Sequence, residues 1–124
     1  MPLMKPLLPL LPLLGTLACT AHSAPEQPAM PPHRVAAEVV HTIESAAATL
    51  NSEAAAEEWT VAHDRFEREL EPLLRAKYTD NEVAEIEYAF GRVHARLGTG
   101  EADEAARVLG ERLAVMVAEL QPQT

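Results

Sequence analysis

Hydrophobic residues recur every three to four positions in four stretches of the chain, which is the spacing of one face of an α-helix. These stretches span residues 32–50, 53–78, 80–97 and 101–121. In the first stretch one face is formed by Val35, Val39, Ile43, Ala46 and Leu50. No segment shows the alternation of hydrophobic and polar residues that a half-buried β-strand requires. The pattern therefore predicts an all-α protein.

Helix-boundary residues lie between these stretches. Asn51 can cap the second helix, and Thr79-Asp80-Asn81-Glu82 has the sequence of a capping box for the third. Gly98 follows the third stretch, where a glycine commonly ends a helix. Pro72 lies inside the second stretch and predicts a kink near residues 68–71, because proline cannot complete the helical hydrogen bonds.

Short connections make successive helices antiparallel, so we expect an up-down antiparallel four-helix bundle. The hydrophobic faces of the second, third and fourth helices supply the residues expected at its centre. These are Trp59, Phe66, Leu70, Ile86, Phe90, Val93, Leu97, Leu109, Leu113 and Met116.

The N-terminal segment has the parts of a secretory signal peptide. Lys5 provides a positive charge, and the hydrophobic run from Leu7 to Leu17 is shorter than the roughly 20 residues of a membrane-spanning helix. Pro9 and Pro12 interrupt the run and Pro6 directly precedes it, which also disfavours a transmembrane helix. We therefore expect residues 1–18 to be cleaved from the mature protein.

The end of this segment, Thr16-Leu17-Ala18-Cys19, resembles the lipobox of bacterial lipoproteins. Ala18 and Cys19 match that pattern, whereas Thr16 and Leu17 depart from it. The resemblance implies that Cys19 becomes the lipidated first residue and anchors the protein to a membrane. Thr20 then resembles a signal for the periplasmic face of the outer membrane. The alternative is ordinary cleavage after Ala18, which would give a secreted or soluble periplasmic protein.

Residues 19–32 are rich in proline, alanine and polar residues, so we expect a disordered tether between Cys19 and the bundle. The predicted organisation is a signal peptide over residues 1–18, a lipidated tether over residues 19–32 and a four-helix bundle over residues 33–121.

Composition and charge narrow the classes of function. The 124-residue chain is 48% hydrophobic, and its formal net charge is −9 without a basic stripe, which argues against a nucleic-acid partner. With Cys19 as the only cysteine, no disulfide can form within the chain. No nucleophile–histidine–acid set, phosphate loop or haem motif is recognisable, so we expect no enzymatic activity.

Four polar residues at the edges of hydrophobic faces form the candidate site. At about 100° per residue, His63 and Glu67 flank the hydrophobic face of the second helix on one side. Glu87 and His94 flank the face of the third helix on the side that an antiparallel pair would turn toward them. His63 and His94 also lie at similar distances from the turn near Thr79, so these side chains can converge.

Two imidazoles and two carboxylates suit one transition-metal ion: zinc, copper, nickel or iron. The other interpretation is a histidine at a helix seam whose nitrogen is satisfied by one carboxylate. His41 lies on the opposite side of its helix from the hydrophobic face, and we expect it at the surface.

The segment AHDRFERELEP resembles the periplasmic imelysin-like proteins of iron uptake, which are helical and have histidine and glutamate ligands. The resemblance covers a small part of the chain. The HxxE signature of that family, with glutamate three positions after histidine, is absent, because the glutamate after His63 is four positions away, at Glu67. No residue role is therefore transferred from that family.

Two functions follow as expectations. The first is an exported lipoprotein that binds a transition-metal ion for buffering, sensing or transfer. The second is a structural or interaction lipoprotein without a ligand, which docks an envelope protein helix to helix. The sequence leaves the oligomeric state open.

Overall fold

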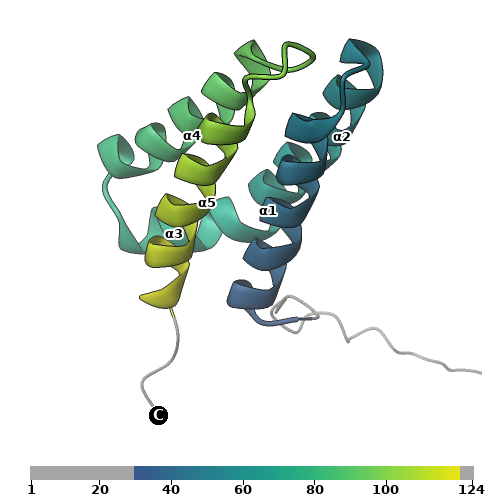
Figure 1. Ribbon diagram of the computed structural model, residues 1–124. Coiled ribbons are helices and arrows are strands. Elements are labelled where there is room, and N and C mark those ends of the chain that lie inside the picture. The colour runs from purple at the N-terminus through teal and green to yellow at the C-terminus, as the bar shows by residue number, and fades with distance from the viewer. Residues whose placement is uncertain (1–29, 121–124) are drawn as a thin grey trace, which may run out of the picture.

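The computed structural model describes residues 30–120, and all of its regular elements are helices (Figure 1). The predicted all-α class is confirmed, because no strand occurs within these residues. In chain order the elements are α1 (Pro32–Ala48), α2 (Ser52–Arg65), the π-helical turn η2 (Phe66–Leu70), α3 (Glu71–Lys77), α4 (Asp80–Ala95) and α5 (Asp103–Ala118).

The helices pack as two connected pairs. Helix α1 contacts both α2 and α5, and α4 contacts α5. Helix α4 also contacts α2 and α3. Figure 1 shows α1 and α2 on one side of the molecule and α4 and α5 on the other. Among the described helices, none combines the length and hydrophobicity that crossing a membrane would need.

The second predicted helix is continuous but irregular. The amide of Glu71 donates to the carbonyl of Phe66, five residues earlier, and this π-type bond defines η2. The turn comes directly before Pro72, which has no amide hydrogen and whose ring would crowd the carbonyl four residues earlier in a regular helix. Near the predicted site the helix thus forms a π-helical turn, which begins at Phe66, slightly before the predicted residues 68–71.

Helix α1 ends before the position that the sequence pattern indicated. Val35, Val39, Ile43 and Ala46 are buried as expected, but Leu50 is 72% exposed. The helix stops at Ala48, and Thr49 adopts an extended conformation. Leu50 therefore leaves the helical face, and its expected place in the hydrophobic face was wrong.

The predicted helix signals at α4 are confirmed. Thr79 and Glu82 form a complete capping box, with each side chain bonded to the other residue's amide. After α4, Gly98 has a φ of 78°, which allows the chain to turn toward α5. The first turn of α5 contains Asp103 and Glu104, whose charges favour a helix N-terminus.

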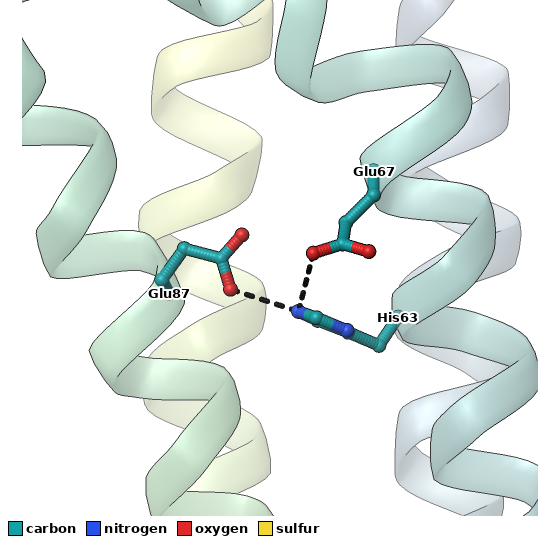
Figure 2. Close-up of side chains that lie close together, drawn as sticks. All are labelled: His63, Glu67 and Glu87. Atoms are coloured by element: carbon teal, nitrogen blue, oxygen red, sulfur yellow. Dashed lines mark hydrogen bonds and ion pairs between the residues drawn. The ribbon is translucent and has the colours of Figure 1, made fainter.

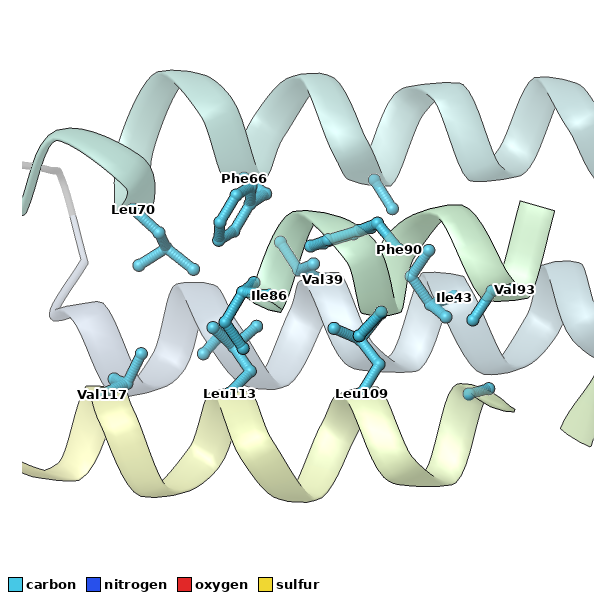
Figure 3. Close-up of a cluster of buried hydrophobic side chains, with 14 of the residues drawn as sticks. Val39, Ile43, Phe66, Leu70, Ile86, Phe90, Val93, Leu109, Leu113 and Val117 are labelled. Carbon is cyan, nitrogen blue, oxygen red and sulfur yellow. The ribbon is translucent and has the colours of Figure 1, made fainter. Parts of the chain in front are cut away.

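A single hydrophobic core joins all the helices (Figure 3). No polar or charged side chain in residues 30–120 is fully buried. Three of the ten expected central residues, Trp59, Leu97 and Met116, are only partly buried at the edge of this core. The other seven are fully buried: Phe66, Leu70, Ile86, Phe90, Val93, Leu109 and Leu113.

Several expectations concern residues outside the described range. The signal peptide, Cys19 and the tether up to residue 29 precede it, and residue 121, the predicted end of the bundle, follows it. These remain predictions from the sequence.

Candidate metal centre

Three of the four predicted ligands meet between α2 and α4. His63 lies near the end of α2, Glu67 one turn later in η2, and Glu87 in the middle of α4. Figure 2 shows both carboxylates directed at the same imidazole nitrogen. His63 Nε2 lies 2.8 Å from Glu87 Oε1 and 3.7 Å from Glu67 Oε2. The prediction that these side chains converge is confirmed for these three residues.

Aromatic rings hold the imidazole in place. The indole of Trp59 stacks on the His63 ring with centroids 4.7 Å apart and planes inclined by 15°. Phe90 contacts the same ring edge-on at 4.9 Å. Trp59 is itself fixed, because its Nε1–H donates to the carbonyl oxygen of Phe90 at 3.0 Å. The side chain of His63 is 15% exposed, and its Nε2 faces carboxylate oxygens of Glu67 and Glu87.

Sequence reasoning assigned Trp59 and Phe90 to the core and missed their contacts with His63. A signal for the first contact was available, since Trp59 precedes His63 by four positions and residues four apart are neighbours on a helix. No comparable local signal marks Phe90, because its contact with His63 joins two helices.

The distances suit a metal ion. One potential ligand atom from each of His63, Glu67 and Glu87 lies within 4.8 Å of the other two. In a tetrahedral zinc site with bonds of about 2.1 Å, ligand atoms are roughly 3.4 Å apart. The two distances from His63 Nε2, 2.8 Å and 3.7 Å, lie on either side of this value, so small side-chain rotations would bring the three atoms to coordinating distance. Three protein ligands would leave a further coordination position open.

Charge at the site also favours a cation. In the described part of the chain, His63 is the basic residue paired with Glu67 and with Glu87. Neighbouring glutamates differ, because Glu69 pairs with Arg65 and Glu71 pairs with Arg75. Two carboxylates therefore share one imidazole, which leaves net negative charge for an additional cation.

His94, the fourth residue expected at the site, does not join the cluster. Its side chain is exposed, and its ring contacts the indole of Trp59 with centroids 4.6 Å apart. His41 is exposed on α1, as expected from its position opposite the hydrophobic face.

Comparisons of the chain with protein-family models, with curated proteins and with solved structures found no match. The function must therefore be argued from the geometry of the chain itself.

Proposed function

We propose that this protein is a small exported, lipid-anchored helical bundle that binds one transition-metal ion through His63, Glu67 and Glu87. The observation behind the proposal is that three potential ligand atoms from two helices lie within 4.8 Å of one another. One nitrogen and two carboxylate oxygens suit zinc, copper, nickel or iron.

The arrangement suits reversible binding better than a closed structural centre. Three ligands leave a coordination position for water or for a ligand from another protein. Glu67 is about half exposed, whereas His63 and Glu87 are less accessible. A metal ion could thus enter and leave on the Glu67 side, as buffering, sensing or transfer requires.

The aromatic contacts support such a site because they fix its only nitrogen ligand. Trp59 and Phe90 hold the His63 ring with Nε2 toward the two carboxylates. Glu67 and Glu87 then differ in role, because Glu87 belongs to the facing helix. An ion shared by His63 and Glu87 would link α2 to α4 and stabilise the folded state.

The finer architecture is part of the same proposal. We infer an up-down antiparallel bundle from the short connections and from the contacts of α1 with α2 and α5 and of α4 with α5. Anchoring through Cys19 is inferred from its lipobox-like sequence. It would hold the bundle on the periplasmic face of the outer membrane.

The second candidate is an interaction lipoprotein without a ligand. One observation favours it: the 2.8 Å contact between His63 Nε2 and Glu87 already satisfies that nitrogen without an ion. In that case His63 would join α2 to α4 through a hydrogen bond, and function would depend on other surfaces.

Thermal unfolding of residues 25–124 distinguishes the two candidates. Chelator-treated protein would be compared with protein containing Zn²⁺, Cu²⁺, Ni²⁺ or Fe²⁺. An ion at about 100 times its dissociation constant should stabilise the fold by about 2.7 kcal/mol. For a domain of this size, the melting temperature should then rise by roughly 10–20 °C.

Four variants assign the ligands, each compared with its own chelator-treated form. His63→Ala and Glu87→Gln should lose the shift, whereas His41→Ala on α1 should keep it. His94→Ala tests the fourth predicted ligand: retention of the shift limits the site to three residues, and its loss adds His94. Absence of a shift with every ion would reject metal binding and leave the interaction candidate.

A further inference from the structure

A groove of about 580 Å³ lies between α4 and α5, on residues that the candidate metal centre does not use. Its hydrophobic lining comes from Ile86 on α4 and from Val115 and Met116 on α5. Val115 is 62% exposed and is one of four large hydrophobic residues that the described part of the chain leaves exposed. The volume falls in the range of ligand-binding clefts, about 300–1,000 Å³.

Tyr78 gives this groove a fixed end. Its hydroxyl lies 3.0 Å from the carbonyl oxygen of Met116 and 2.9 Å from Glu119 Oε1. These contacts hold the segment before α4 against the end of α5. The groove is therefore shaped by hydrogen bonds and by packed helices, as a preformed binding surface requires.

Acidic side chains line both walls. Glu82 and Glu85 belong to α4, Glu111 belongs to α5 and Glu119 directly follows α5, whereas Arg112 is the basic residue among the lining side chains. Hydrogen bonds and ion pairs within the chain neutralise only a small part of the negative charge of these glutamates.

Arg107 pairs with Glu111, but Glu82 and Glu119 bond to the uncharged residues Thr79 and Tyr78. The walls thus remain acidic on a chain whose formal net charge is −9. A positively charged partner is the electrostatic complement of such a groove.

We propose that this groove binds a basic amphipathic helix of a partner protein. The hydrophobic face of that helix would lie on the exposed Val115 and the partly buried Met116, above the buried Ile86, as in other helix-in-groove complexes. Lysine or arginine residues on either side of that face would meet the carboxylates of α4 and α5.

The spacing of the acidic residues favours a helix over a small cation. Glu111 on α5 and Glu119, the C-cap residue of α5, are eight positions apart, which corresponds to about 12 Å along the helix axis. That length matches about two turns of a bound helix. Acidic residues on both walls can also pair with charges on both flanks of one hydrophobic face.

Fluorescence anisotropy with the full chain tests the proposal. The probe is a labelled synthetic helix of about 18 residues, with leucines at positions i, i+3, i+4 and i+7 and lysines on both flanks. Chelator would be present throughout, so that the result does not depend on the candidate metal centre. We expect saturable binding that weakens as salt is added, because salt screens the charge pairs. A scrambled peptide of the same composition should bind at least tenfold more weakly.

Matched variants locate the surface. Val115→Lys should weaken binding at least tenfold, whereas Val61→Lys should not, although Val61 on α2 is similarly exposed at 65%. Glu85→Lys should likewise weaken binding, with Glu57→Lys on α2 as its control. Circular dichroism would verify that each variant is folded.

Three results would overturn the proposal. Equal binding of the scrambled peptide would show attraction by charge alone. Equal effects of Val115→Lys and Val61→Lys would place binding elsewhere. Binding of monomeric dodecyltrimethylammonium that depends on Val115, without binding of the helical peptide, would make the ligand a small cationic amphiphile.

Discussion

Tyr78 connects the end of α3 to the end of α5 through its hydroxyl group. Burial raises the pKa of this phenol to about 12, and the hydrogen bond and negative charge of Glu119 act in the same direction. The folded state therefore favours the protonated phenol. This contribution to stability is fully present below about pH 10, the pKa of an unfolded tyrosine, and is lost as the pH rises toward 12.

Tyr78→Phe should separate these two effects. The variant loses a hydrogen bond, so its free energy of unfolding at neutral pH should fall by about 1 kcal/mol. Between about pH 10 and pH 12, its stability should then decline less steeply than that of the unmodified protein. Urea unfolding at several pH values measures both quantities. Tyr88→Phe is the control, since Tyr88 is 65% exposed; an equal change of slope in that variant would contradict the assignment to Tyr78.

Residue positions on ideal helices predicted much of the candidate site. The angles and heights of His63, Glu67 and Glu87 were sufficient to bring them together, because each depends on the regular geometry of its own helix. His94 was placed by the same reasoning, which ignored the volume of Trp59. The indole lies against both histidine rings and bonds to the backbone of α4. Such packing depends on side-chain shape across two helices, which periodicity does not describe.

At the scale of elements, the turn between α4 and α5 depends on a glycine. Gly98 has a φ of 78°, and a Cβ there would collide with the side chain of Ser52 at the start of α2. Gly98→Ala should lower the free energy of unfolding by roughly 2 kcal/mol, because the left-handed conformation alone costs about 1–2 kcal/mol. Chemical denaturation with matched alanine variants measures the effect.

Gly91→Ala is the matched control in the interior of α4. A Cβ at Gly91 meets no atom within 4 Å outside the local helix backbone. The variant should be more stable by about 0.5–1 kcal/mol, because alanine favours a helix interior. If both alanine variants changed stability in the same direction, the conformation of Gly98 would not be what limits this turn.

Helix boundaries were predicted best where one residue has a local effect. Thr79 and Glu82 form their capping box with atoms only three residues apart, and Pro72 removes one particular hydrogen bond. Leu50 was placed wrongly because its hydrophobicity fitted the face of α1, whereas the helix ends at Ala48. There the side chain of Thr49 bonds to Ser45 and to Glu58 on the next helix. The end of α1 thus coincides with a contact between α1 and α2, which the spacing of hydrophobic residues along α1 did not predict.

At the scale of the whole molecule, periodicity predicted the helical class but not the neighbours of each helix. The hydrophobic face of α1 indicates only that this face is buried, and it does not identify the helices that cover it. In the structure, α1 packs against both α2 and α5. The faces left outside that core are strongly acidic, and the groove between α4 and α5 combines this charge with exposed hydrophobic surface. The proposed metal site uses Glu87 of α4, whereas the proposed docking groove is lined by Glu82, Glu85 and Ile86, so the two proposals do not compete for the same residues.

Cys19 should decide whether the whole molecule is held at a membrane. In a bacterium with two membranes, we expect the protein expressed from the full chain to sediment with membranes and to partition into detergent. Stable anchoring requires more than one acyl chain, so the lipid on Cys19 should carry at least two. Cys19→Ser should be found in the soluble fraction or remain unprocessed. Mass spectrometry should show that the unmodified protein begins at a lipidated Cys19. A soluble protein beginning at Cys19 without added lipid would instead establish ordinary cleavage after Ala18, and the bundle would then act as a diffusible periplasmic protein.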